Sequence, residues 1–101
     1  RRLRVLTPLF RLPATRDFYL LAILRNASPA SPARIDELIQ ANRRLFDQCV
    51  AIGGKRYPVD SVPMSRQDWQ RHYEPLWGFV NASKQHFDPD NILAPGQGIF
   101  S

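Results

Sequence analysis

The stretch from His86 to Phe100 constrains the fold of this chain more than any other. A helical pattern leads into it and ends at Asp88-Pro89, because proline cannot continue a helix. Two apolar pairs, Ile92-Leu93 and Ile99-Phe100, then flank the sequence Pro95-Gly96-Gln97-Gly98. A disordered tail has no surface against which it could bury four large apolar side chains. We therefore expect an ordered C-terminus that packs against another surface and presents a Pro-Gly turn.

The composition describes a small globular domain. The chain has 101 residues, of which 44% are hydrophobic and 23% charged, so classes of disordered and fibrous protein are not expected. The net charge of +5 comes from scattered arginines without a basic run among aromatic residues, so we expect no nucleic-acid partner. No apolar run has membrane-spanning length, so we expect no membrane partner. The chain opens Arg-Arg-Leu-Arg without methionine, which is typical of part of a longer protein.

A long helix is predicted from Ser31 to about Ile52. Ser31 is a preferred N-cap residue, and Pro32 suits the first helical position. Gly53-Gly54 is expected to end the helix. Apolar residues recur along it at helical spacing: Ile35, Leu38, Ile39, Leu45, Phe46 and Cys49. Asn42 falls within this stripe; it either hydrogen-bonds into the core or marks a half-exposed edge, and we favour the second.

Two shorter helices are predicted after an extended connection. The pattern Ser65-x-x-Asp68 is typical of a capping box, with Asp in place of the usual Glu or Gln. Pro75 should interrupt the helical pattern, so we expect one helix near 66–73 and another from about 75 to Phe87. Their shared face is aromatic and apolar: Trp69, His72, Tyr73, Leu76, Trp77 and Val80.

The first third of the chain favours strands. The segment Leu3 to Phe10 mixes β-branched and apolar residues, and Pro8 would place it at a sheet edge. The segment Phe18 to Leu24 is almost continuously apolar, as is typical of a strand buried on both faces. Periodicity alone also allows a helix, but Pro13 before it and Asn26-Ala27-Ser28-Pro29 after it favour a strand. The predicted fold class is therefore α+β.

The residues form no evident catalytic or metal-binding set. His72 and His86 lack an obvious carboxylate partner, and three or four metal ligands at workable spacing cannot be assembled. We expect His72 to pack on a helix flank and Cys49 to be a small core residue. Two polar groups on predicted loops remain as candidates for binding, Tyr57 and Gln97. Since nothing else in the chain forms a site, we expect the surface that receives the tail to lie outside this chain.

The chain resembles the C-terminal segment of cytokinin dehydrogenase-type flavoproteins, within the vanillyl-alcohol oxidase family of FAD-linked oxidases. The matching pieces stand in the family's order and cover nearly the whole chain. They are Phe18-Tyr19-Leu20-Leu21-Ala22-Ile23-Leu24-Arg25, Asn42 through Cys49, Trp69-x-x-His72-Tyr73, Trp77, Lys84, Phe87-Asp88-Pro89, and Ile92-Leu93-Ala94-Pro95-Gly96-Gln97-Gly98-Ile99-Phe100.

The resemblance implies a fold, a domain division and two site residues. Residues 1–57 would be the C-terminal part of an antiparallel-sheet substrate (cap) domain with covering helices. Residues 58–101 would be a helix and tail that return to the FAD-binding domain. Gln97 would then contact the flavin of the cofactor FAD, and Tyr57 would border both flavin and substrate. The family usually has Leu after this tyrosine, where this chain has Pro58, and an ungapped alignment would place Val59 at the tyrosine's position.

The implied activity is that of an FAD-dependent oxidoreductase that oxidises a small amine or alcohol by hydride transfer to the flavin. No catalytic residue is expected within this segment, because the family's catalytic base and FAD-pyrophosphate loops lie upstream of it. FAD and the substrate would be bound together with that upstream portion. The alternative from another class is a small stand-alone α+β binding or interaction domain that uses its aromatic face as an interface.

Overall fold

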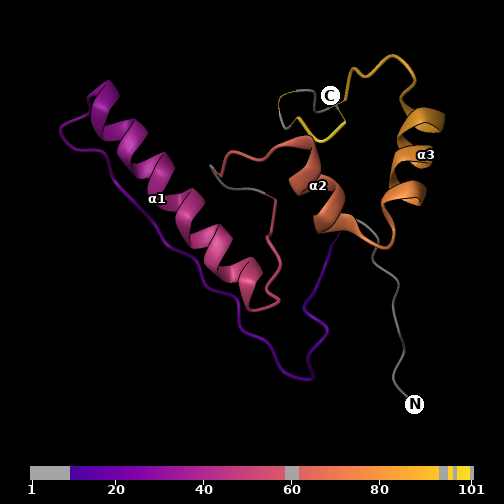
Figure 1. Cartoon of the computed structure of the whole chain (residues 1–101). Helices are drawn as coiled ribbons and strands as arrows, with labels where there is room; N and C mark the ends of the chain where they lie inside the picture. The colour runs from indigo at the N-terminus through magenta and orange to yellow at the C-terminus, as the bar shows by residue number, and fades with distance from the viewer. Residues whose placement is uncertain (1–9, 59–61, 94–95, 97, 101) are drawn as a thin grey trace. The chain divides into compact units, whose positions relative to one another are not determined.

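The computed structural model of the 101-residue chain describes residues 10–58, 62–93, 96 and 98–100. These residues contain three helices, α1 (Pro32–Ala51), α2 (Arg66–Tyr73) and α3 (Trp77–Phe87) (Figure 1). The chain divides into two compact units, one of residues 12–63 and the other of residues 1–11 with 64–101. The first unit contains α1, and the second contains α2, α3 and the C-terminal tail.

Helix α1 begins and ends where its local signals predict. The Ser31 side chain accepts a hydrogen bond from the Arg34 backbone N–H at 3.2 Å, and Pro32 occupies the first turn. At the other end, Gly53 has a φ of +83°, a left-handed conformation that glycine adopts without steric cost. The Gly54 N–H donates to the Cys49 carbonyl at 2.8 Å, which satisfies one of the last helical acceptors. The predicted helix is confirmed.

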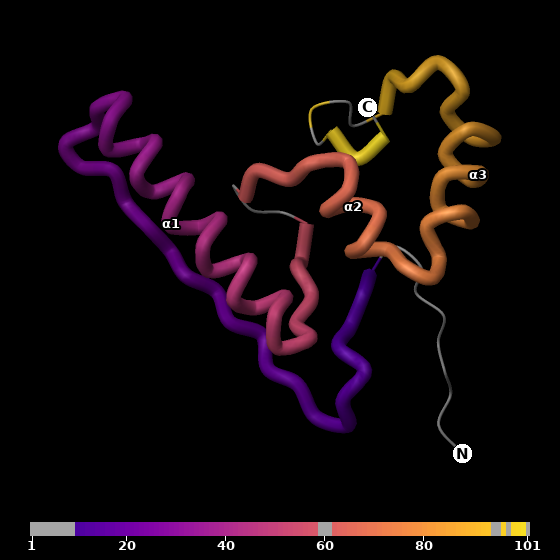
Figure 2. The backbone as a smooth tube through the Cα atoms, viewed as in Figure 1, coloured from indigo at the N-terminus to yellow at the C-terminus, as the bar shows by residue number. Residues whose placement is uncertain are grey.

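The apolar residues of α1 do not form a buried core in this unit. No residue of the helix is fully buried, and Cys49 is exposed, so our expectation of a buried cysteine was wrong. Asn42 is half-buried, as favoured from the sequence, and its Oδ1 accepts a hydrogen bond from Arg25 Nε at 2.9 Å. This bond holds the segment before α1 alongside the helix, where the tube in Figure 2 runs back along it.

The predicted sheet is absent from the part of the chain that the structure describes, and the α+β fold class is corrected accordingly. Phe18 to Leu24 forms no strand, and its side chains are largely exposed, with Tyr19 at 95% and Leu24 at 97%. The segment Leu3 to Phe10 lies outside the described residues except for Phe10, which forms a bend. A strand needs a partner for its backbone groups and a cover for its faces, and among the described residues this segment has neither. The structure is helical, and an antiparallel-sheet fragment of a cap domain is not present in it.

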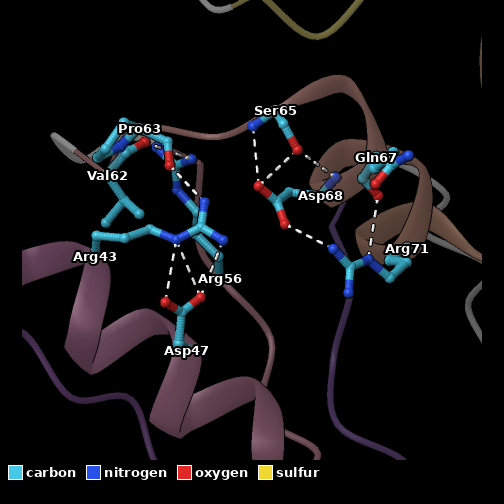
Figure 3. Close-up of polar contacts among 9 residues, drawn as sticks. All are labelled: Arg43, Asp47, Arg56, Val62, Pro63, Ser65, Gln67, Asp68 and Arg71. Atoms are coloured by element: carbon cyan, nitrogen blue, oxygen red, sulfur yellow. Dashed lines mark hydrogen bonds and ion pairs between the residues drawn. The ribbon is translucent and has the colours of Figure 1, made fainter.

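The capping box of α2 is confirmed. The Ser65 side chain accepts from the Asp68 N–H at 3.2 Å, and Asp68 Oδ2 accepts from the Ser65 N–H at 2.9 Å. The other carboxylate oxygen, Oδ1, accepts from Arg71 at 3.1 Å, within the same helix (Figure 3). Hydrogen bonds between residues three positions apart, from Ser65 to Asp68 and from Asp68 to Arg71, therefore stabilise the first turn of α2.

Helix α2 ends at Tyr73, and α3 begins at Trp77, two residues later than the sequence indicates. The intervening Pro75 has no N–H and its ring opposes a continuous helix, so the chain turns before α3 starts. The Val80 N–H donates to the Leu76 carbonyl at 2.9 Å, which closes the first turn of α3. The helix ends at Phe87, directly before Asp88-Pro89, as predicted.

The core of the second unit consists of Trp69, Tyr73 and Val80. Trp69 is only 1% exposed and stacks on Tyr73 with a centroid distance of 6.1 Å. His72 is also buried, and its ring packs edge-on against Tyr73 at a centroid distance of 4.9 Å. Further apolar residues pack around this cluster: Met64, Leu76, Trp77, Ile99 and Phe100.

The C-terminal tail packs on this core. The series of stacked rings continues from Tyr73 to Trp77 at 6.3 Å and from Trp77 to Phe100 at 6.0 Å. The expectation of an ordered tail is therefore confirmed at Ile99 and Phe100. The expectation that its receiving surface lies outside the chain was wrong for these two residues, whereas Ile92 and Leu93 remain exposed.

Candidate functional site

The segment after α3 is organised by the carboxylate of Asp88, which is buried at the end of the helix. Its Oδ1 accepts from the Ile92 N–H at 2.9 Å, and its Oδ2 accepts from the Leu93 N–H at 2.9 Å. It also accepts a hydrogen bond from the ammonium group of Lys84, one helical turn earlier. A carboxylate that receives several N–H donors holds the backbone more firmly than a neutral acceptor does. Asp88 thus fixes the chain just before residues 94–98.

Lys84 connects this anchor to the end of the tail. Its Nζ donates to the Leu93 carbonyl at 2.9 Å and lies 5.3 Å from the centroid of the Phe100 ring. The side chains of Lys84 and Asp88 are 10% and 4% exposed. One ammonium group therefore contacts the helix end, the start of the tail and its last aromatic ring.

Gln97 itself lies outside the described residues, but residues before and after it in the sequence are described. On one side, Leu93 is held by Lys84 and Asp88. On the other side, Phe100 stacks on Trp77. Apart from its two chain neighbours, no described residue has an atom within 4 Å of the place that a Cβ of the exposed Gly96 would occupy, so its backbone is open to close approach. Gly98, with φ of +62°, has the left-handed conformation for which glycine is suited.

The pKa of Asp88 lies below its ordinary value of 3.8, chiefly because of the hydrogen bond from Lys84. Burial alone would raise the pKa of this carboxyl, and the Leu93 and Ile92 N–H groups lower it further. A lowered pKa in the folded state means that the ionised form stabilises the fold. This contribution is complete above pH 3.8 and is lost as the pH falls through the lower, folded-state pKa.

A pH series therefore tests the Asp88 anchor. We expect the wild-type protein to melt at a higher temperature than Asp88→Asn near neutral pH, because the amide cannot be ionised. The difference should shrink as the pH falls below 3.8, because the unfolded wild-type protein then binds a proton at Asp88 that the folded protein still lacks. Thermal unfolding of both proteins, followed from about pH 7 down to about pH 3, measures this. A difference that stays constant over the whole range would contradict the ion pair.

Tyr57 lies on the connection that follows α1, in the unit of residues 12–63. Next to it, Arg56 is buried and its Nη1 donates to the Val62 carbonyl at 3.2 Å. Arg43 on α1 binds Asp47 at 3.0 Å and also donates to the Pro63 carbonyl at 2.8 Å (Figure 3). These bonds hold the connection to itself and to α1, and they leave Tyr57 49% exposed. Tyr57 and the described neighbours of Gln97 thus belong to different units, each ordered by its own contacts.

Two roles in this site were missed from the sequence, those of Lys84 and Asp88. The available signal was a lysine four residues before an aspartate at a helix end, a spacing that brings both side chains together. An Asp-Pro pair at the end of a helix also favours side-chain hydrogen bonds to the following backbone. Among the described residues there is no group of three metal-ligating side chains, and no helix is both long and apolar enough to cross a membrane.

Comparison with known proteins gives a family match over most of the chain. Residues 9–100 match the family model described as "Cytokinin dehydrogenase 1, FAD and cytokinin binding". No solved structure matches the chain.

Three similar proteins carry related descriptions. The "Uncharacterized oxidoreductase ORF5 in fasciation locus" of Rhodococcoides fascians is 41% identical over 92 residues, which are 91% of this chain and 20% of that protein. Cytokinin dehydrogenase 8 of Oryza sativa subsp. indica is 34% identical over an alignment of 101 residues. This alignment covers 88% of this chain and 19% of that enzyme. Cytokinin dehydrogenase 5 of Oryza sativa subsp. japonica is 38% identical over 93 residues, 87% of this chain and 17% of that enzyme.

The chain spans about a fifth of the length of these relatives. The resemblance that the sequence motifs indicate is confirmed, because the family model covers the chain from residue 9 to residue 100. The chain belongs to the cytokinin dehydrogenase family, in the part described as FAD and cytokinin binding.

Proposed function

We propose that this chain is the C-terminal part of an FAD-dependent oxidoreductase that oxidises a small amine or alcohol, with a cytokinin-like amine as the first candidate. The observation that carries the proposal is the family match over residues 9–100. Bound FAD would supply the hydride acceptor, while the protein binds and orients the substrate. The segment contributes no catalytic base in this proposal, and by itself it would be inactive.

The described residues near position 97 are compatible with a flat heterocyclic group. Gly96 presents open backbone without a side chain, and the exposed Ile92 and Leu93 provide apolar surface in the same segment. Sites for cofactors are mostly apolar with a few placed polar groups, and this composition corresponds to that pattern. The contacts at Leu93 and Phe100 hold described residues on both sides of position 97 in the sequence.

In this proposal Gln97 and Tyr57 have separate tasks. The Gln97 side-chain amide has both a donor and an acceptor, so it would hydrogen-bond one edge of the flavin ring. Tyr57 would border the flavin and the substrate. Residues 1–57 would belong to the substrate domain, and residues 58–101 would pack on the FAD-binding domain.

Gln97→Ala in the full-length protein tests the cofactor contact. We expect the flavin absorption spectrum and reduction potential to shift, because a hydrogen bond to the ring changes its electron distribution. The thermal unfolding midpoint should change little. Gln85→Ala is the matched control, since Gln85 is an exposed glutamine on α3. If both variants leave the spectrum and potential at their wild-type values, Gln97 is not a flavin contact.

A second experiment tests the reaction class. The full-length protein would be mixed anaerobically with each member of a panel of isoprenoid adenines, alcohols and aldoses. The rate at which each compound reduces the bound flavin would be measured. Rapid bleaching by the isoprenoid adenines would support the amine substrate, and a preference for an alcohol or an aldose would replace it. A full-length protein that purifies without flavin absorbance would contradict the proposal as a whole.

A further inference from the structure

We propose that Lys84 is a positioning residue: it holds Leu93 and Phe100, and the flavin contact proposed for Gln97 depends on it. The effect on the flavin rests on the proposed function, whereas the effect on the segment does not. Lys84 has no expected contact with substrate or cofactor, and it acts through Leu93 and Phe100.

The first support is that three contacts converge on one ammonium group. Lys84 Nζ donates to the Asp88 carboxylate and to the Leu93 carbonyl, and it lies over the Phe100 ring. An ammonium group has three N–H donors and can also be attracted by the face of an aromatic ring. All of these partners belong to the end of α3 or to the tail, so the lysine links the two ends of the segment.

The second support is burial. Lys84 is 10% exposed and Asp88 is 4% exposed, which is unusual for lysine and aspartate. Charges in such places need to be paired and hydrogen-bonded, and removing one partner leaves the other uncompensated. A surface lysine that only aids solubility would not have this environment.

The third support is the separation between the anchored points. Leu93 and Phe100 are seven positions apart, and Gln97 lies between them. A binding group whose neighbours on both sides are held loses less conformational freedom when it meets its ligand. Helix α3 has its own attachment to the core through Val80, so the segment can be released without unfolding the helix.

The test uses Lys84→Met in the full-length protein, because methionine retains an unbranched apolar side chain and loses the charge and the donors. We expect amide hydrogen exchange in a peptide covering residues 92–100 to become at least about tenfold faster, while α2 amides keep their protection. Lys84→Arg should restore part of the protection, because it keeps a cationic donor. Lys55→Met is the matched control, since Lys55 is the other lysine of the chain and lies in the other unit.

A double-mutant cycle with Gln97→Ala separates positioning from stability. If Lys84 acts through Gln97, Lys84→Met should shift the flavin reduction potential in the wild-type background and hardly at all in the Gln97→Ala background. Equal shifts in both backgrounds would overturn the positioning role. Loss of α2 protection in Lys84→Met would also overturn it, because the lysine would then support the whole unit.

The outcomes distinguish this inference from the proposed function. Unchanged exchange in the tail peptide of Lys84→Met overturns the inference and leaves the flavin proposal intact. If Gln97→Ala leaves the flavin spectrum and reduction potential unchanged while Lys84→Met speeds amide exchange in the tail peptide, Gln97 is not part of the site. Lys84 is then still supported as the residue that holds the tail.

Discussion

Replacing Trp69 with alanine should lower the free energy of unfolding of the α2–α3 unit by about 3–5 kcal/mol, the usual cost of truncating a fully buried tryptophan. Trp69 is 1% exposed and lies at the start of the stacked series that runs through Tyr73 and Trp77 to the tail. Its removal would leave a cavity beside Tyr73 and His72, which the short helices cannot fill without shifting. The expected result is therefore loss of order in the whole unit rather than a local change.

Hydrogen exchange of α2 and α3 amides in the full-length protein measures this effect. A loss of about 3–5 kcal/mol corresponds to protection that falls by roughly two to three and a half powers of ten. Phe79→Ala is the control, since Phe79 is an exposed aromatic residue on α3. Protection in Trp69→Ala that matches the control would mean that Trp69 is not the centre of this core.

Replacing Phe100 with alanine should release the end of the tail at a cost of about 2 kcal/mol, from lost apolar burial and ring stacking. Phe100 stacks on Trp77 at 6.0 Å and lies under the Lys84 ammonium at 5.3 Å. The variant removes both contacts but leaves the Lys84 and Asp88 bonds to Leu93 in place. The segment would thus be freed at one end only.

Exchange in the tail peptide should accordingly become about thirtyfold faster at residues 98–100 and change little at Ile92 and Leu93. Phe87→Ala is the matched control, because Phe87 is an exposed phenylalanine at the end of α3. A second readout is the fluorescence of Trp77, whose ring loses its neighbour. If residues 98–100 keep their wild-type protection, the tail does not depend on this stack.

The division of the chain into two ordered units bears on both candidate site residues. Tyr57 is placed by the connection after α1, through the bonds of Arg56 and Arg43 to Val62 and Pro63. The neighbours of Gln97 are placed by α3 and by the aromatic core. Variants of one unit should therefore leave the local order of the other unchanged.

Much of the secondary structure could be predicted because its signals act locally. The N-cap at Ser31 and the capping box at Ser65 and Asp68 each satisfy backbone groups within three residues. Pro75 and Asp88-Pro89 interrupt or end helices through constraints on their own backbone. The structure agrees with the sequence at these places because such interactions need no distant partner.

The predictions that failed concern partners far away in the sequence. A continuous apolar run such as Phe18 to Leu24 indicates burial but does not say what covers it, and the described residues provide no paired strand. Cys49 follows the periodicity of α1, yet it is exposed, because the described residues of its unit do not cover it. Periodicity identifies a face, whereas burial requires a second surface.

The sequence by itself determined the helices, their ends except for the start of α3, the family and the presence of an ordered tail. Only the tertiary structure decided that the tail packs on its own α2–α3 core and that Lys84 and Asp88 hold it. The physical reason is that helix ends depend on neighbouring backbone groups, whereas the path of the tail depends on three-dimensional proximity. The contact of Trp77 with Phe100 joins residues 23 positions apart, and no local pattern encodes such a pairing.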